Sequence, residues 1–235
     1  MDVVGAGLTD RGLQRETNED AFACVPHLNL FLVADGMGGH AAGEVASQTA
    51  AVAIQDKVKE LLDDNDLTPL RDSRGYPCVG ARRLLIAVEY ANEEIFRIAE
   101  SNESRRGMGT TVAALHFSEG YAHLCHVGDS RIYRVRNGSI ERLTEDHAIA
   151  ANVLSRALGI APVVQASWRV EPVGPGERFV LCTDGVHGLI SDDEILQIVQ
   201  SNTRDCAAAC AELVALANRR GGRDNSTALV VETFL

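Results

Sequence analysis

The sequence lacks the features that would place it in a membrane or on nucleic acid. No apolar run approaches the ~20 residues that span a bilayer, and the first ten residues, MDVVGAGLTD, lack the basic start of a signal peptide. Basic residues are in deficit, with 22 Lys and Arg against 33 Asp and Glu, so the net charge is −11. A basic nucleic-acid-binding surface is therefore not expected. These absences predict a cytoplasmic protein that binds neither membrane nor nucleic acid.

Cysteine is present but is not placed for cross-linking. Cys125 and Cys182 lie inside apolar, strand-like runs, and Cys206 and Cys210 share one helix face. Disulfides and reduced thiols are both open readings, and the apolar surroundings favour reduced core thiols in a cytosolic protein. None has a setting that indicates a catalytic nucleophile. The six are Cys24, Cys78, Cys125, Cys182, Cys206 and Cys210.

Internal repeats and low-complexity segments are also missing from the 235 residues. The contents of 46% hydrophobic and 23% charged residues are ordinary for a globular protein. A single domain over residues 1–235, with a sizeable core, is the simplest expectation for this length.

The chain is organised around one stretch, FLVADGMGGH at 31–40. Its apolar first half predicts a buried strand, and the glycines that follow leave the backbone free for a tight turn. Asp35 stands where the strand ends, and a carboxylate at the end of a buried strand is costly unless something compensates its charge. The adjacent Gly36 also frees a backbone carbonyl that can point the same way.

Three further aspartates repeat this placement. Asp184 follows the run RFVLCT, Asp129 follows YAHLCHVG, and Asp224 stands just before the closing run STALVVETF. Four apolar strands thus each deliver an Asp to one of their ends. Oxygen-only ligands of this kind suit hard divalent cations, Mg²⁺ or Mn²⁺, better than Zn²⁺.

The order of elements predicts an α+β protein. Two helices, a run of antiparallel strands with an Asn137-Gly138 hairpin turn, and then two helices around a final strand suggest two antiparallel sheets packed face to face, with helices on their outsides. Ser191 and Glu194 form a capping box at one helix start. The expected elements are a strand at 1–8, helices at 41–62 and 84–98, a loop at 63–77, strands from 107, a short helical piece at 152–158, strands at 167–173 and 178–183, helices from 191 to 220, and a last strand at 226–234.

Two polar clusters each allow two readings. The segment 9–22, TDRGLQRETNEDAF, is either a solvated loop or a loop that faces phosphate and metal. His123 and His126 with Asp129 have the spacing HxxHxxD, which resembles a metal site. Positions three apart in a strand point to opposite faces, so a joint site is not expected there.

Eight stretches, in order along nearly the whole chain, resemble the metal-dependent protein phosphatase (PPM) family, 2C type, in its bacterial form. They are TDRGLQRETNEDAF, VADGMGGHAAGE, MGTTVAA, HVGDSRIYR, LTEDHA, NVLSRALG, LCTDGVHGLIS and GGRDNSTALVV. The resemblance implies an αββα four-layer sandwich of two antiparallel β-sheets flanked by helices, with two Mn²⁺ or Mg²⁺ ions at one edge. It also implies hydrolysis of phosphoserine and phosphothreonine in proteins by a water that the ions activate, without a phosphoenzyme.

The resemblance also implies roles by position. Asp35 looks like the carboxylate that bridges the two metals, Asp184 and Asp224 would complete the first metal, and the Gly36 carbonyl would bind the second. Arg15 matches the family's phosphate-binding arginine, since a guanidinium offers two parallel N–H donors to a phosphate.

Residues around these ligands follow from the same match. Glu19 and Asp20 correspond to positions that hold metal-bound waters by hydrogen bonds, and Asn225 is placed with them around the ligands. Asp129 corresponds to a ligand of a third metal that shares Asp184; a turn-capping role is its alternative.

The histidines near the motifs differ from the family pattern. Some members carry a histidine directly after Asp-Gly as general acid for the leaving alkoxide, but Met37 stands there and His40 lies further on. His40 is therefore only a candidate general acid, and a metal-bound water is the alternative. Asp146-His147 matches the family's LTxDH motif, for which a structural hydrogen-bonding role is expected.

One departure concerns substrate access. Only residues 148–151 separate His147 from NVLSRALG, where bacterial relatives have a longer helical flap beside the active site. Substrate selection by a flap is therefore not expected, and the 63–80 loop is a candidate for replacing its contacts.

The expected partners are phosphorylated proteins, including a cognate serine/threonine kinase, and we expect a monomer. A phosphoprotein-binding module with little turnover and a two-metal nuclease are alternative classes. The intact set of Asp35, Asp184, Asp224 and Arg15 argues against the first, and the acidic pI argues against the second.

Overall fold

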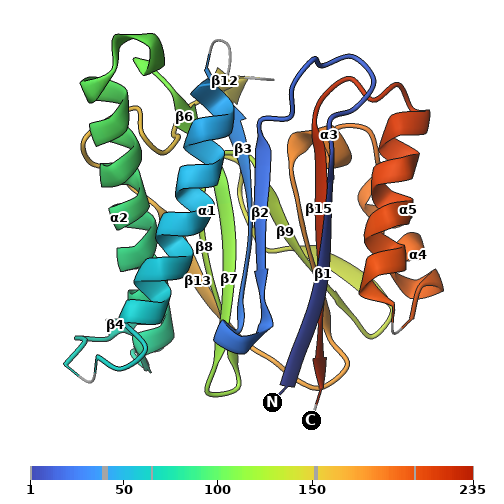
Figure 1. Ribbon diagram of the computed structural model, residues 1–235. Helices are drawn as coiled ribbons and strands as arrows, with labels where there is room; N and C mark the ends of the chain where they lie inside the picture. Colours follow the sequence, from blue (N-terminus) through green and yellow to red (C-terminus); the bar gives the residue numbers. More distant parts are fainter. Residues whose placement is uncertain (1, 39–41, 65, 151–152, 204, 235) are drawn as a thin grey trace.

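The computed structural model describes residues 2–38, 42–64, 66–150, 153–203 and 205–234, and it has four layers (Figure 1). Helices α1 (Ala42–Glu60) and α2 (Val79–Ser101) cover one antiparallel sheet. Helices α4 (Asp192–Ser201) and α5 (Cys206–Arg219) cover the other. The predicted αββα sandwich is confirmed.

Both large sheets are antiparallel throughout. The five-stranded sheet has the order β1 (Asp2–Asp10), β15 (Ser226–Phe234), β14 (Arg178–Cys182), β9 (Arg131–Arg136), β10 (Ser139–Arg142). The six-stranded sheet has the order β13 (Ser167–Pro172), β8 (Tyr121–Val127), β7 (Val112–Ser118), β3 (Leu30–Met37), β2 (Asp20–Val25), and β6 (Gly109–Thr110) pairs with β3. Short segments connect these elements: η1 (Pro26–Leu28), η2 (Glu103–Arg105) and α3 (Asp184–His187).

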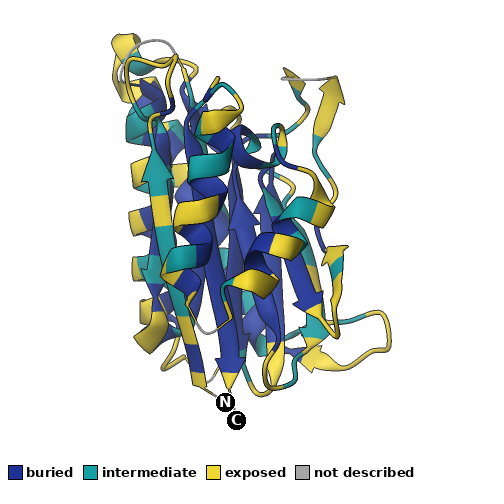
Figure 2. Ribbon diagram, turned by 90° about the vertical axis from the view of Figure 1, so that its right-hand side faces the viewer, coloured by how far each residue is buried: buried dark blue, intermediate teal, exposed yellow. Residues whose placement is uncertain are grey.

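The period-two alternation of the strands decides which side chains lie between the sheets. In β3, Phe31 and Val33 belong to the inter-sheet core, whereas Leu30, Leu32 and Ala34 pack against the layer of α1 and α2. Figure 2 shows the central strands as buried, behind helices whose outward residues are exposed. The next inner-facing position of β3 is therefore Asp35, so the core itself ends in a carboxylate.

Local signals in the sequence account for several boundaries. The backbone N–H of Ser191 donates to the Glu194 carboxylate at 3.1 Å where α4 begins, as the capping box predicted. Asn137 and Gly138 have φ values of 51° and 78° in the turn between β9 and β10, which is the geometry of a two-residue hairpin. All six cysteines carry free thiols. Of the helices described, none is both long and apolar enough to cross a bilayer.

The short helical piece expected at 152–158 is wrong. Val153–Leu154 form β12, which pairs with β11 (Ala148–Ala150) in a small hairpin. The Ser155 N–H donates to the His147 carbonyl at 2.8 Å, and the Leu158 N–H donates to the Thr110 carbonyl at 2.8 Å. Such partners outcompete a helix this short, because an isolated turn of helix gains few bonds for the residues it fixes.

The 63–80 loop does not lie at the carboxylate edge. It contains the small hairpin of β4 (Leu70–Arg71) and β5 (Pro77–Cys78) and joins the end of α1 to the start of α2. The loop follows the last residue of α1, whereas the first turn of α1 lies at the carboxylate edge, where Gly43 packs against Gly36. The 19 residues of α1 span roughly 28 Å, and Figure 1 shows β4 and β12 at opposite ends of the molecule. The expectation that this loop replaces flap contacts is therefore wrong.

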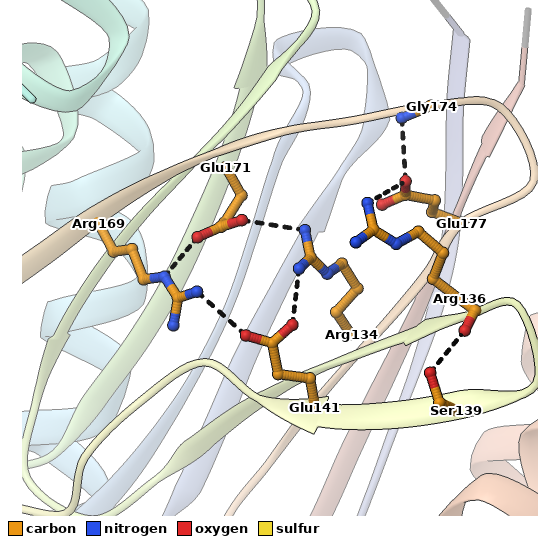
Figure 3. Close-up of polar contacts among 8 residues, drawn as sticks. All are labelled: Arg134, Arg136, Ser139, Glu141, Arg169, Glu171, Gly174 and Glu177. Carbon is orange, nitrogen blue, oxygen red and sulfur yellow. Dashed lines mark hydrogen bonds and ion pairs between the residues drawn. The ribbon is translucent and has the colours of Figure 1, made fainter. Parts of the chain in front are cut away.

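A network of ion pairs closes one side of the sandwich where β9 and β10 of one sheet approach β13 of the other (Figure 3). Arg134 bonds to Glu141 at 2.6 Å and to Glu171 at 3.0 Å, and Arg169 pairs with the same two glutamates. Each carboxylate here faces guanidinium groups, so the two sheets are joined by compensated charges.

Candidate metal centre

A cavity of about 500 Å³ opens at the edge where β3 ends, and it gathers the predicted aspartates. Asp35 comes from β3, Asp129 follows β8, Asp184 begins α3 directly after the β14 segment, and Asp224 precedes β15. Segments from both sheets therefore deliver carboxylates to one place. The lining residues are Arg15, Glu19, Asp35, Gly36, Met37, Gly38, Thr111, Asp129, Leu154, Asp184, Asp224 and Asn225.

The backbone of Asp35 is held by two threonines. Its N–H donates to Thr111 Oγ1 at 3.0 Å, and its carbonyl accepts from the Thr111 N–H at 2.9 Å and from Thr110 Oγ1 at 2.9 Å. Thr111 Oγ1 also lies 2.7 Å from Ser130 Oγ. These bonds use the backbone groups of Asp35 and leave its side chain to the cavity.

Close backbone packing explains the glycine after Asp35. A Cβ on Gly36 would lie 2.1 Å from the Gly43 carbonyl oxygen and 2.5 Å from the Glu19 carbonyl oxygen. A Cβ on Gly43 would in turn lie 2.2 Å from Glu19 Oε2. The glycine pair therefore lets the first turn of α1 approach β3 and brings the Glu19 carboxylate to the helix N-terminus, where the backbone dipole favours an anion.

Asp20 is buried, with 6% of its surface exposed, and it lies directly opposite Asp35 in the β2–β3 register. Its Oδ2 accepts hydrogen bonds from Thr227 Oγ1 at 2.6 Å and Thr183 Oγ1 at 2.8 Å. Directly opposite side chains lie on the same face of a sheet, so Asp20 and Asp35 both face the space between the sheets.

Asn225 fixes the polar 9–22 segment at the cavity. Its Nδ2 donates to the carbonyls of Arg11 and Thr17, both at 2.9 Å, and its Oδ1 accepts from the Glu19 N–H at 2.8 Å. Asn225 therefore holds the backbone of the 9–22 segment in place beside the predicted ligands. Arg15 and Glu19 of this segment line the cavity, and the reading of the segment as a loop that faces phosphate and metal stays a prediction.

Arg15 lies beside one of the predicted ligands. Its Nη2 donates to Asp224 Oδ2 at 2.6 Å, while the Asn225 N–H donates to Asp224 Oδ1 at 2.9 Å. The Arg15 side chain is 56% exposed, so its guanidinium sits at the mouth of the cavity.

The carboxylates raise one another's pKa values. Burial raises the pKa of Asp35 well above its usual range, and the charges of Asp20 and Asp184 raise it further. Burial, with the charges of Asp224 and Asp129, raises the pKa of Asp184 to about 6. Burial also raises the pKa of Asp20 to about 7, against the hydrogen bonds from its two threonines. A site that holds so much like charge gains from positive charge between its members.

The donor set fits hard divalent cations. Asp184 Oδ1 and Asp20 Oδ1 are buried without a hydrogen-bond partner, and buried polar atoms of this kind call for a ligand. Carboxylate and carbonyl oxygens suit Mn²⁺ or Mg²⁺. Within the described ranges, no three His, Cys, Asp or Glu side chains close tightly around a single point. The oxygens line a cavity instead, which suits ions that keep several water ligands.

Asp129 lies at the boundary between this cavity and a neighbouring one that Asp146, Ile149 and His187 also line. Asp184 borders both cavities, so the shared third-metal position and its turn-capping alternative are both compatible with the placement of Asp129. The turn that carries it is well anchored. Arg131 donates to both Asp146 oxygens, at 3.0 and 2.7 Å.

The expected structural role of Asp146-His147 is confirmed. The Gly128 N–H donates to His147 Nδ1 at 3.2 Å, next to Asp129. His126 stacks on His147 with ring centroids 4.6 Å apart, whereas His123 bonds to Ser118 Oγ at 2.9 Å. The two strand histidines thus have separate surroundings. His40 lies outside the described residues.

Several residues that shape the site carry no metal-ligand signal in the sequence. Thr183 directly precedes Asp184, Thr227 stands three residues after Asp224, and Thr111 lies in the stretch MGTTVAA. The only local signal is their position in phase with the inner faces of strands. Gly43 could have been found from its pairing with Gly36 across the turn.

The family model described as Protein phosphatase 2C matches residues 11–224. The chain is 33% identical to the serine/threonine phosphatase Stp of Listeria monocytogenes over 253 aligned residues, covering 97% of this chain and 94% of that protein.

Two solved structures are similar in fold and sequence. The serine/threonine phosphatase PstP/Ppp of Mycobacterium tuberculosis superposes with a TM-score of 0.87 at 31% identity, with 100% of each chain covered. The catalytic domain of PstP in complex with two manganese ions superposes with a TM-score of 0.86 at 32% identity, covering 100% of this chain and 99% of that one. The chain therefore belongs to the protein phosphatase 2C family and is a protein phosphatase of the serine/threonine class.

Proposed function

We propose that this enzyme hydrolyses phosphoserine and phosphothreonine in proteins at a centre of two Mn²⁺ or Mg²⁺ ions, without a phosphoenzyme. One observation carries the proposal: Asp35, Asp184 and Asp224 line a single cavity with Arg15 at its mouth. Carboxylates to hold cations and a guanidinium to hold phosphate are the two parts that phosphoryl hydrolysis needs.

Each proposed metal site has its own residues as ligands. Asp35 would bridge the ions, Asp184 and Asp224 would complete one site, and the Gly36 carbonyl would serve the other. Two divalent ions supply positive charge that acidifies a water and neutralises the phosphoryl oxygens. The two manganese ions in the PstP catalytic domain support this assignment. Asp129, with Asp184, is the candidate for a third ion.

The chain's own groups orient the substrate. Arg15 is held by Asp224 at the cavity mouth, where its planar fork can bind two phosphate oxygens. Glu19 and Asp20 accept hydrogen bonds from water at the centre. Among the lining residues the only hydroxyl or thiol belongs to Thr111, and its Oγ1 is already engaged with Asp35 N and Ser130 Oγ. This supports direct attack by water, with His40 or a water as proton donor to the leaving group.

We further propose phosphorylated proteins as substrates, a cognate serine/threonine kinase among them, and a cytoplasmic monomer. The names of the relatives, which are serine/threonine phosphatases, support the substrate class. The net charge of −11 supports the exclusion of nucleic acid.

The test measures phosphate release from a phosphothreonine peptide and from p-nitrophenyl phosphate with added Mn²⁺, beside cleavage of a DNA oligonucleotide. We expect Mn²⁺-dependent release from both phosphate esters and no DNA cleavage. DNA cleavage would favour the nuclease alternative. Phosphopeptide binding without turnover would favour the regulatory module, and activity that persists in excess chelator would refute the metal assignment.

A further inference from the structure

A chain of hydrogen bonds, buried at its inner end, ends on the Asp20 carboxylate. Thr227 Oγ1 lies 2.6 Å and Thr183 Oγ1 lies 2.8 Å from Asp20 Oδ2. Thr9 Oγ1 lies 2.7 Å from Thr227 Oγ1, and Asn18 Nδ2 donates to Thr9 Oγ1 at 2.9 Å. Thr183 and Thr227 are fully buried. The chain therefore joins the 9–22 segment to the strand ends that carry the predicted ligands.

The direction of each bond follows from counting protons. A hydroxyl has one proton to give, and Thr227 gives its proton to Asp20, so Thr9 must donate to Thr227. Thr183 also gives its proton to Asp20 and accepts from the Thr227 N–H at 3.0 Å. Every donor thus points toward a single oxygen, Asp20 Oδ2. Hydrogen bonds that run head to tail strengthen one another in a buried setting.

The second oxygen of the Asp20 carboxylate, Oδ1, takes no part in this chain. Asp20 Oδ1 is buried and has no hydrogen-bond partner, and Asp20 lies opposite Asp35 on the inner face of the sheet. Thr183 directly precedes Asp184, and Thr227 is three residues after Asp224. The Asp20 carboxylate, on β2, is thus bonded to the segment that carries Asp184 and to the segment that carries Asp224.

We propose that Thr183 and Thr227 are positioning residues for the metal centre. They hold Asp20 Oδ2 so that Oδ1 keeps a fixed direction toward the cations, and they thereby set the affinity for Mn²⁺. The inference rests on the proposed function in taking the carboxylate cavity as the cation site. Removal of either hydroxyl takes away one of the two donors that hold Oδ2 in this buried place, so the carboxylate is held less firmly.

The first experiment titrates Mn²⁺ alone into the protein by isothermal calorimetry, without substrate. Valine has the shape of threonine without the hydroxyl, and we expect Thr227→Val and Thr183→Val each to weaken Mn²⁺ binding by about 10- to 100-fold. Thr227→Ser and Thr183→Ser keep the donor and should stay within about 3-fold of the parent. Unchanged affinity in both valine variants would overturn the proposal.

The matched control is Thr233→Val. Thr233 is also buried in β15 and its Oγ1 donates to the Gly174 carbonyl at 2.8 Å, but it lies six residues from Thr227, roughly 20 Å along the strand. It should lower the melting temperature while leaving Mn²⁺ affinity as in the parent. Weaker Mn²⁺ binding in Thr233→Val would mean that any lost buried hydrogen bond has this effect, and would overturn the positioning role.

A double-mutant cycle tests whether the threonines act through Asp20. In the Asp20→Asn background, Thr227→Val should change Mn²⁺ affinity by less than about 3-fold, and additive effects would overturn the inference. If circular dichroism shows Thr227→Val unfolded, Thr183→Val and Thr183→Ser carry the same comparison. The calorimetry uses no substrate, so it tests the inference independently of the phosphatase reaction. If the variants bind Mn²⁺ as expected but the parent releases no phosphate from a phosphothreonine peptide, the proposed function is refuted and the inference stands.

Discussion

The inter-sheet core is bordered by charged side chains in two places, and the two borders are built oppositely. Where β9 and β10 meet β13, Arg134 and Arg169 alternate with Glu141 and Glu171, so each charge faces its opposite (Figure 3). At the end of β3 the inner positions carry carboxylates, with Arg15 as the only guanidinium among the lining residues. In β3 and in β9 the charged residue occupies the inner position after the last apolar one, with Asp35 after Val33 and Arg134 after Ile132.

The pKa values of the two borders move in opposite directions. The hydrogen bond from Arg134 lowers the pKa of Glu141, whereas burial and neighbouring carboxylates raise the pKa values of Asp35 and Asp184. Compensated charges stabilise a fold without further partners, but charges of one sign raise the energy of the folded protein until a ligand arrives. The difference separates a structural border from a functional one.

The largest expected effect is at the functional border. Asp35→Ala or Asp184→Ala should lower kcat by roughly three orders of magnitude, because each removes a proposed metal ligand. The same change removes one repelling carboxylate, so the metal-free variant should melt no lower than the metal-free parent. Phosphate release at saturating Mn²⁺ and thermal melting in chelator check both parts. Parent-like turnover in either variant would end the binuclear assignment.

The opposite outcome is expected at the structural border. Glu171→Ala removes one of two partners from Arg134, which is 5% exposed, and should cost about 2 kcal/mol of unfolding free energy with kcat/KM unchanged. Arg97→Ala is the matched surface control, since Arg97 is 67% exposed and its pair with Glu94 is worth less than about 1 kcal/mol. Urea denaturation measures both. A loss of activity without a loss of stability in Glu171→Ala would contradict the division of roles.

A smaller effect is expected for the one cation of the functional border. Arg15→Lys keeps the charge and loses the planar fork, so KM should rise by about 10-fold while kcat falls less. Arg15→Ala should raise KM further. Steady-state kinetics with a phosphothreonine peptide gives both constants, and parent-like values in both variants would mean that the phosphate is bound elsewhere.

The two borders should also differ in their response to pH. The pKa of Asp184 is raised from 3.8 to about 6, so the folded protein binds more protons than the unfolded chain between these values. Its contribution to stability is present below about pH 4 and is lost as the pH rises through about 6. Metal-free Asp184→Asn should therefore lose fewer degrees of melting temperature than the parent between pH 4 and 6, by a few degrees.

Burial lowers the pKa values of His116 and His123 to about 3 and 4, which adds stability as the pH rises toward 6.5. Both histidines remain in Asp184→Asn, so their effect cancels in the difference between the two proteins. Equal slopes of melting temperature against pH would show that Asp184 is not strained by its neighbours.

Much of this contrast was accessible from the sequence. Apolar runs that end in Asp35 and Asp184 predicted the strands, and the chemistry of carboxylates predicted the kind of ion. The threonines that hold Asp20 were not accessible, because their role needs β2 to meet the ends of β14 and β15, and Asp20 lies more than 150 residues before both threonines. Hydroxyl side chains carry no signal of their partner.

The two errors have a different physical cause. The expected helix at 152–158 failed because backbone partners from distant residues outcompeted a local pattern of few residues. The 63–80 loop was misplaced because its position depends on the length of α1, which carries the chain from the cavity to the far end of the sandwich. The conformation of the first segment and the position of the second both depend on the topology of the whole chain rather than on the composition of the segment.

The smallest effect is expected from that loop. Replacement of residues 65–76 by a short Gly/Ser link should leave kcat/KM for phosphothreonine peptides within about 2-fold of the parent, because the loop lies at the end of α1 away from the cavity.

The β11–β12 hairpin covers little of the cavity, with Leu154 in its lining and Ile149 exposed. Few contacts can then favour one flanking sequence over another. A peptide panel assayed on both proteins should show kcat/KM values that vary little with flanking sequence. Sharp peptide preference in the parent would contradict the open cavity, and its loss on loop replacement would show that the far end of the molecule binds substrate.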